Sequence, residues 1–328
     1  MIFRRLSLLF TILIISACTH FPSENKHVTQ LPTASLSEQN YVFIKGRELT
    51  QTNDVIVSFI ENFPNITISI LNLEGDDDEK IVADILKAKS PEIVICLGYW
   101  AAKTAINVEK ETPIIFAMVT NHKRYPELRQ ANVTGIAMEI PPLSLLTQFK
   151  MLMPKLNSVA VPFHPSLSAE IVGDAINASQ EIGMQLVKIA ITNPNDIMVN
   201  LVDQKNNYTG LWMLADTKLY NHETEVIYNL IRFSKQQKKP LLVFSETFLK
   251  PGAFFSISVD YNSLGSQLAL IAKQIVQDNH LPINIPIALP IGTHTVMNKE
   301  TALLLLGNNF DESIYDEVDK VYSKYNDF

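Results

Sequence analysis

Short runs of β-branched and aliphatic residues recur along the chain from about residue 40, and amphipathic segments with helical spacing separate many of them. The runs are nearly continuous rather than alternating, which is typical of parallel strands covered on both faces. Two of the intervening segments, residues 79–88 and 169–182, have helical periodicity, and the second stops before Gly183, a residue that often ends helices. The strands predicted in this way are residues 41–44, 66–71, 93–97, 114–119, 133–137, 159–163, 186–191, 210–214 and 241–244.

This alternation predicts an α/β fold with two doubly wound parallel-sheet lobes, because a single sheet would need too many strands. The length of 328 residues also suits about two domains. We place the boundary between residues 137 and 145, where Pro141 and Pro142 interrupt the pattern before a new helix begins.

The first candidate ligand site follows the predicted strand at residues 93–97. In open α/β sheets, ligands bind in the loops beyond the carboxyl ends of the strands. Here that loop is Gly98, Tyr99, Trp100 and Ala101, and it opens a helix whose free N–H groups suit an anion such as a carboxylate. Trp100 offers a stacking face to a ligand. The alternative is that Tyr99 and Trp100 pack between helix and sheet.

Three further predicted strands also end in short polar side chains. Any one such pair can simply cap a helix. Their recurrence at four strand ends, however, favours a shared polar cleft, because capping alone does not require so many. The residues concerned are Thr120 and Asn121, Asp216 and Thr217, and Ser245 and Glu246.

The composition argues against several other functions. No nucleophile elbow, phosphate-binding loop or dinucleotide fingerprint occurs, and the seven histidines include no pair at metal-ligand spacing. We therefore predict no catalytic residue, metal or cofactor, and no enzyme. Residues 76–78 are three aspartates before a predicted helix, which favours a solvated first turn over a cation site. His164 is a lone histidine at a strand end and only a weak candidate for ligand contact.

The N-terminus predicts export. Arg4 and Arg5 precede an apolar run at residues 6–15, which is too short to cross a bilayer, and small residues lead to Cys18. Residues 1–17 are therefore predicted to be a signal peptide. The end of this segment resembles the lipobox of bacterial lipoproteins, which implies lipidation at Cys18. An ordinary signal peptide with a chance cysteine and an uncleaved anchor are the alternatives.

Cleavage after residue 17 has consequences for the rest of the chain. Residues 18–39 are rich in proline and serine and read as a flexible tether. Cys96 then lacks a partner for a disulfide and is expected in the core. The mature chain keeps 25 basic against 34 acidic residues, with the basic ones scattered, which excludes nucleic acid as a partner.

One segment carries a family resemblance. The pattern G-A-x₆-D-Y-x₃-G at residues 252–265 resembles the substrate-binding lipoproteins of ABC transporters in the tryptophan and tyrosine uptake-like family. Further segments from about residue 90 to 310 agree in order and spacing. They are residues 112–117, 132–135, 193–196, Asp216, and Met297-Asn298 with Ala302, Leu306 and Gly307.

The resemblance implies a periplasmic binding protein-like type I fold, in which three crossovers form a hinge and the ligand lies between the lobes. The lobes would be residues 40–138 with 262–290 and residues 139–261 with 291–310, followed by a C-terminal tail or helix at 311–328. The implied function is binding a small solute, such as an amino acid, and handing it to a membrane permease. The implied cleft residues are Gly98, Tyr99, Trp100, Ala101, Thr120, Asn121, Ser166, Asp216, Thr217, Ser245 and Glu246.

The chain departs from the family pattern at the ligand loops. Tyr99 and Trp100 stand where the family has a Thr-Pro pair, and Asn121 stands where it has an aspartate. Glu246 is a candidate to supply the negative charge that this aspartate would carry. Thr19 stands where an aspartate would mark inner-membrane retention, so the membrane is undecided between inner and outer. The alternative function is therefore a lipoprotein with the same two lobes that serves as a sensor or envelope-assembly partner.

Overall fold

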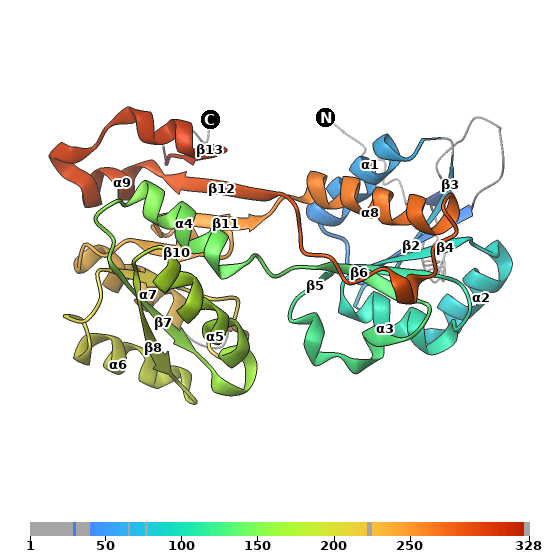
Figure 1. Cartoon of the computed structure of the whole chain (residues 1–328), viewed down its shortest axis with the longest axis horizontal. Helices are drawn as coiled ribbons and strands as arrows, with labels where there is room; N and C mark the ends of the chain where they lie inside the picture. The colour runs from blue at the N-terminus through green and yellow to red at the C-terminus, as the bar shows by residue number, and fades with distance from the viewer. Residues whose placement is uncertain (1–28, 31–39, 65, 76–77, 222–224, 325–328) are drawn as a thin grey trace, which may run out of the picture.

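The structure, a computed structural model, describes residues 29–30, 40–64, 66–75, 78–221 and 225–324. The chain forms two α/β lobes joined side by side (Figure 1). This confirms the predicted fold class, and each of the nine predicted strands is present. Within the described ranges, no helix has both the length and the apolar character needed to cross a bilayer. The signal peptide, Cys18 and most of the predicted tether lie outside the described residues.

The first lobe is built on a six-stranded sheet in the order β1-β3-β2-β4-β5-β6. All its neighbouring strands run parallel except the short β1, which pairs antiparallel with β3. The strands are β1 (Thr29–Gln30), β2 (Asn40–Lys45), β3 (Thr67–Asn72), β4 (Ile93–Leu97), β5 (Ile114–Val119) and β6 (Val133–Ala137). The helices are α1 (Thr50–Asn62), α2 (Glu79–Lys89), α3 (Tyr99–Val108) and α8 (Tyr261–Val276), with 3₁₀ turns η1 (His122–Arg124), η2 (Pro126–Arg129) and η5 (Pro282–Asn284).

The second lobe is built on a seven-stranded sheet in the order β13-β12-β11-β10-β9-β7-β8. Only the β11–β12 pair is antiparallel. The strands are β7 (Ser158–Phe163), β8 (Gln185–Ala190), β9 (Gly210–Trp212), β10 (Leu241–Val243), β11 (Phe255–Val259), β12 (Thr293–Asn298) and β13 (Lys320–Tyr322). The helices are α4 (Pro142–Leu152), α5 (Pro165–Glu181), α6 (Ile197–Asp203), α7 (Val226–Gln236) and α9 (Lys299–Leu306), with 3₁₀ turns η3 (Pro194–Asp196), η4 (Glu246–Phe248), η6 (Gly307–Asn309) and η7 (Glu312–Glu317).

The chain passes between the lobes three times. It leaves the first lobe between β6 and α4, returns between β11 and α8, and leaves again between η5 and β12 (Figure 1). The Asp260 carboxylate caps the N-terminus of α8 by accepting a hydrogen bond from the Ser263 N–H, which fixes where the second passage ends. Each lobe is therefore discontinuous in sequence.

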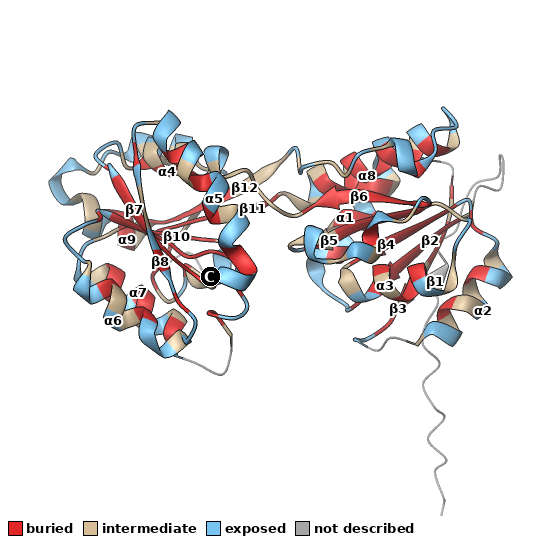
Figure 2. Cartoon of the chain, turned by 60° about the horizontal axis from the view of Figure 1, so that its bottom comes forward, coloured by how far each residue is buried: buried red, intermediate tan, exposed pale blue. Residues whose placement is uncertain are grey.

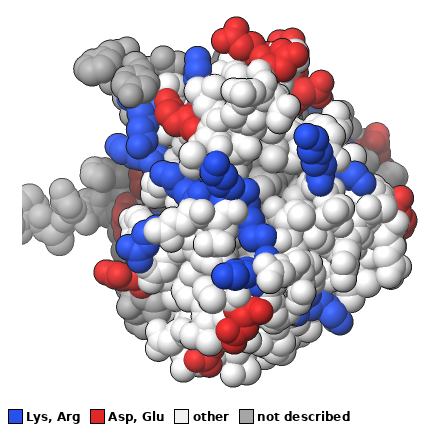
Figure 3. Space-filling model, turned by 90° about the vertical axis from the view of Figure 1, so that its left-hand side faces the viewer, with Lys and Arg blue, Asp and Glu red and all other residues white. Residues whose placement is uncertain are grey.

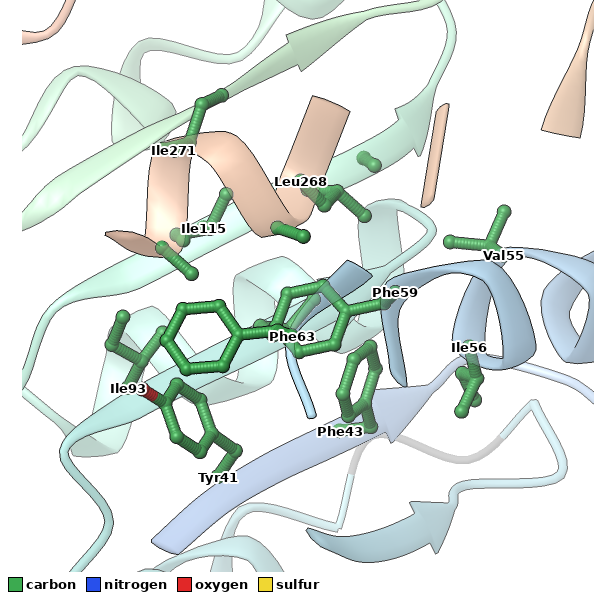
Figure 4. Packing of buried hydrophobic residues seen from close by; sticks show 14 of the residues in the cluster. Tyr41, Phe43, Val55, Ile56, Phe59, Phe63, Ile93, Ile115, Leu268 and Ile271 are labelled. Atoms are coloured by element: carbon green, nitrogen blue, oxygen red, sulfur yellow. The ribbon is translucent and has the colours of Figure 1, made fainter. Parts of the chain in front are cut away.

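Helix α8 packs along α1 on one face of the first sheet, and their buried side chains form the core shown in Figure 4. Phe59 and Phe63 on α1 stack with nearly parallel rings, 5.9 Å apart between centroids. The close approach of the helices requires Gly265, because a Cβ atom there would lie 2.3 Å from the Val55 carbonyl oxygen. Figure 2 shows that both sheets are buried between their helices.

The two ends of the described chain differ from the prediction. Residues 29 and 30, predicted as part of the tether, pair with β3 and so join the first sheet. Residues 311–328 were predicted as a tail or helix. In the structure their described part forms η7 and then β13, which extends the second sheet beside β12 because its backbone pairs with residues 296–298.

Candidate functional site

A cavity of about 630 Å³ lies between the lobes and is lined by residues of both. The first lobe contributes Thr50, Gln51, Asp54, Thr120 and Asn121. The second contributes Leu145, Ser168, Ile171, Trp212, Leu214, Ala215, Val243, Phe244, Ser245, Glu246, Ile257 and His294. The passages between the lobes contribute Met138, Glu139, Ile140 and Asp260, and the adjoining ends of β11 and α8 contribute Ser258, Val259, Tyr261 and Asn262.

The first wall comes from the start of α1, directly beyond the carboxyl end of β2. Buried Lys45 at that strand end holds Glu48, which lowers the pKa of the Glu48 carboxyl below its usual range. The helix begins after Leu49 and places Thr50, Gln51 and Asp54 at the cavity. Asp54 is half-buried, and no described side chain pairs with its carboxylate.

Thr120 and Asn121 follow β5 on the same side of the cavity. Asn121 adopts a left-handed backbone with φ of 52°, which asparagine tolerates better than most residues. Its N–H donates to one oxygen of Glu139, and the other Glu139 oxygen lies 3.0 Å from Nδ1 of His122. Glu139, on the first passage between the lobes, therefore anchors the loop after β5.

The second-lobe wall is largely apolar. Trp212, Leu214 and Val243 are almost completely buried beside the cavity, and Phe244 makes an edge-on ring contact with Phe248. Such side chains suit the apolar part of a solute. The polar end of this wall is Ser245 and Glu246. They lie just after the end of β10 at Val243, where Ser245 caps η4 and Glu246 begins it.

Most acidic groups at the cavity also make contacts within the protein. The Glu246 carboxylate lies 3.1 Å from the ammonium of Lys320 on β13, and the Glu246 side chain is half-exposed. Asp260 uses one oxygen to cap α8, and its neighbour Tyr261 is partly buried, which raises the pKa of the phenol. No Lys or Arg is found among the described residues that line the cavity.

The predicted loop at residues 98–101 lies outside the cavity lining. Gly98 has a φ of +99° and begins α3, while Ala101 is buried in the core. Tyr99 stacks on Tyr125, with ring centroids 3.8 Å apart, and donates a hydrogen bond to Glu127. Burial, with a smaller contribution from this hydrogen bond, raises the pKa of Tyr99 to about 12. Trp100 is 46 % exposed. None of the four lines the cavity in this structure.

Asp216 also lies behind the cavity wall, with only 1 % of its surface exposed. Its Oδ2 accepts hydrogen bonds from the His164 N–H and the Ser168 hydroxyl, and its Oδ1 accepts one from the Lys218 N–H. Asp216 thereby ties the loop after β9 to the start of α5. It reaches the cavity only through Ser168, which does line it.

Ser166 and Thr217, the remaining predicted residues, lie outside the cavity lining. The hydroxyl of Ser166 is 3.0 Å from Nδ1 of His164 and accepts a hydrogen bond from Lys218 at 2.7 Å. Thr217 is exposed. Of the eleven predicted site residues, the structure thus brings Thr120, Asn121, Ser245 and Glu246 together at the cavity.

Sequence reasoning missed Asp54, Glu139, Trp212 and His294, which all line the cavity. The strand-end rule could have found the Asp54 segment, since α1 follows the first predicted strand of the lobe. Glu139 and His294 lie in or beside the passages between lobes, for which no local sequence signal exists. Within the described ranges, no cluster of His, Cys, Asp and Glu could hold a metal ion.

The chain was compared with known proteins. Residues 58–322 match the family model described as ABC transporter substrate binding protein. A protein from Clostridioides difficile (strain R20291) named tyrosine-binding protein is 19 % identical over 245 residues, which span 72 % of this chain and 70 % of the relative.

Two solved structures share the fold. One is the ligand-free, open structure of a substrate binding protein with adhesive properties from Clostridium difficile. It has a TM-score of 0.70 and 17 % identity, and the match covers 87 % of this chain and 100 % of that one. The other is an ABC domain in complex with L-Trp from Streptococcus pneumonia, with a TM-score of 0.59, 18 % identity and the same coverage.

Proposed function

This chain belongs to the ABC transporter substrate-binding protein family, and from that premise we propose that it is tethered to a membrane, closes its lobes around a small solute and delivers it to an ABC permease. The family comprises extracytoplasmic substrate-binding proteins and not enzymes, so the chain binds its solute without converting it.

The observation that carries the proposal is the cavity between the lobes. Its walls come from both lobes and from the passages that join them, so a change in their angle would change its shape. Bending at a few residues between rigid lobes is a common way to enclose a ligand. We propose Thr120, Asn121, Ser245 and Glu246 as ligand contacts, with Gly98, Tyr99, Trp100, Ser166 and Thr217 as contacts that lobe closure would have to add. Ala101 and Asp216 are buried and would act only by holding their neighbours in place.

The ligand we propose is an amino acid or a similar small solute. Support comes from two similar proteins, one named tyrosine-binding protein and one solved in complex with L-Trp. The polar and apolar parts of the cavity also suit such a molecule. Thermal unfolding of the full-length protein in detergent, screened against amino acids, amines and small organic acids, tests this. A ligand at 100 times its Kd should add about 2.7 kcal/mol of stability. A complete screen without stabilisation would contradict the proposal.

The tether we propose is a lipid attached at Cys18, with residues 18–39 as the spacer. Labelling cells with radioactive palmitate tests it, because Cys18→Ser should abolish the label while leaving the polypeptide detectable. Thr19, following Cys18, supports the second candidate, a sensor or envelope-assembly lipoprotein of the outer membrane. Separating inner from outer membranes discriminates between the two, since an outer-membrane protein would lie far from an inner-membrane permease.

A further inference from the structure

We infer that the solute held in the cavity between the lobes is an organic cation, with Asp54 as a principal anchor of its ammonium group. This inference rests on the proposed function and specifies the chemistry of the same cavity. It starts from the charges there: Asp54, Glu139, Glu246 and Asp260 line it, whereas no described lining residue is a Lys or Arg.

These carboxylates are not equally free. Glu246 has Lys320 as a partner at 3.1 Å, and Glu139 has His122 and the Asn121 N–H. Asp54 has no cationic or hydrogen-bond partner among the described residues. Asp260 has only the Ser263 N–H that caps α8. Two negative charges at the cavity therefore lack a positive partner within the described protein.

Closing the lobes would remove water from these two carboxylates. A desolvated carboxylate is costly unless a positive charge or several hydrogen bonds replace the water. A zwitterion brings one charge of each sign and leaves the balance negative. A cation supplies the missing positive charge, so closure favours a solute with net positive charge.

Aromatic side chains at the cavity supply a second, independent feature that suits such a ligand. Trp212 and Phe244 face the cavity from the second lobe, and Tyr261 faces it from the start of α8. Aromatic rings attract cations through the negative potential of their faces. They also cover the hydrocarbon part of an amine, so carboxylates and aromatic walls together fit an ammonium on an apolar body.

Positive side chains are present in the protein but gather elsewhere. Figure 3 shows Lys and Arg side chains spread across the middle of the outer end of the second lobe. Lys123, in η1 of the first lobe, bridges the lobes by pairing its ammonium with Glu170 on α5. Neither residue lines the cavity. The negative charge of the cavity is therefore not explained by a lack of Lys and Arg in the protein as a whole.

The test uses matched probes with the full-length protein in detergent. Tyramine and L-tyrosine share a ring and an ammonium and differ in the carboxylate. Cadaverine and L-lysine also differ in the carboxylate and lack a ring, with net charges of about +2 and +1 at neutral pH. We expect isothermal titration to show tyramine binding at least about tenfold more tightly than L-tyrosine, and cadaverine more tightly than L-lysine. Tyramine affinity should fall only slightly with added salt, because salt screens an ion pair enclosed between closed lobes much less than an exposed one.

The variant that tests the anchor is Asp54→Asn, matched with Glu61→Gln on the exposed end of the same helix. Asp54→Asn should weaken tyramine binding about tenfold or more, because it removes the unpaired charge. Glu61→Gln should change it less than twofold. The melting temperatures of both ligand-free variants should match the parent, which verifies folding.

Three outcomes overturn the inference. L-Tyrosine binding as tightly as tyramine would show that the site accepts zwitterions equally. Equal losses in Asp54→Asn and Glu61→Gln would remove Asp54 from the site. Absence of tyramine and cadaverine binding, while a solute without net positive charge stabilises the protein, would refute the cation but leave the proposed function standing. If no solute at all stabilises the protein, the proposed function fails as well.

Discussion

The carboxyl edges of the two sheets carry the same kinds of polar residue but use them differently. At the first sheet, Asn121 follows β5 and lines the cavity. At the second sheet, Asp216 follows β9 and is buried, and its carboxylate accepts three hydrogen bonds, from His164, Ser168 and Lys218. A polar residue at a strand end is thus either a candidate ligand contact or an internal tie. Burial and the number of satisfied hydrogen bonds distinguish the two.

The largest effect expected is the loss of stability in Asp216→Ala. This substitution leaves the Ser168 hydroxyl and two backbone N–H groups without their acceptor, which should cost about 2–4 kcal/mol. Urea unfolding of the ligand-free protein measures it. Asp203→Ala, at the exposed C-terminus of α6, is the matched control and should stay within about 0.5 kcal/mol of the parent. Equal stability of the two variants would contradict the stabilising role of Asp216 and with it the contrast between the two sheet edges.

The next effect is on affinity, at the first sheet edge. Asn121→Gly removes the side chain at the cavity while suiting the left-handed backbone, so stability should change by about 0.5 kcal/mol or less. Loss of one hydrogen bond to a ligand should weaken binding about three- to tenfold. Isothermal titration with a solute identified in the screen measures this. Unchanged affinity would show that the Asn121 side chain does not contact the ligand.

A smaller effect is expected where the two lobes meet at the surface. Lys123 and Glu170 form an ion pair between η1 and α5, and the hydrogen bond to Glu170 raises the pKa of the Lys123 ammonium. Because the pKa is raised on folding, the pair stabilises at neutral pH, and its contribution disappears as the pH rises through the folded pKa. Both side chains are exposed, so Lys123→Ala should cost about 0.2–1 kcal/mol and less in high salt. A salt-independent loss would mean that Lys123 contributes by packing instead.

The smallest effect expected is that of Trp100→Ala. Trp100 is exposed and lies outside the cavity lining, so this structure predicts a change in ligand affinity below twofold and little change in stability. A tenfold loss of affinity, measured by titration beside the parent, would show that lobe closure brings residues 98–101 onto the ligand. The family resemblance implies that result, so the variant separates the two views of this loop.

The fold was predictable to the extent that its signals are local. The nine predicted strands are nearly continuous apolar runs, and all are present. Strands β11 and β12 were missed, because polar Ser256, Ser258, His294 and Thr295 interrupt the apolar pattern. Both strands lead into passages between the lobes. Pairing between two such distant segments depends on tertiary structure rather than on local periodicity.

The site was predictable only in part. Strand-end logic found Thr120 and Glu246, which line the cavity, and also Asp216, which does not. Whether Asp216 faces solvent depends on Ser168 and His164, more than 45 residues away in sequence. Glu139 and Asp260 reach the cavity because the lobes meet there, and no local pattern encodes which faces will meet.

The central claim is that a solute binds between the lobes. The most direct test is a crystal structure of the protein with the tightest ligand from the screen. We predict ligand density in contact with both α1 residues such as Asp54 and second-lobe residues such as Phe244, with the lobes closer together than in the ligand-free protein. Ligand bound to one lobe only, or outside the cavity, would contradict the account.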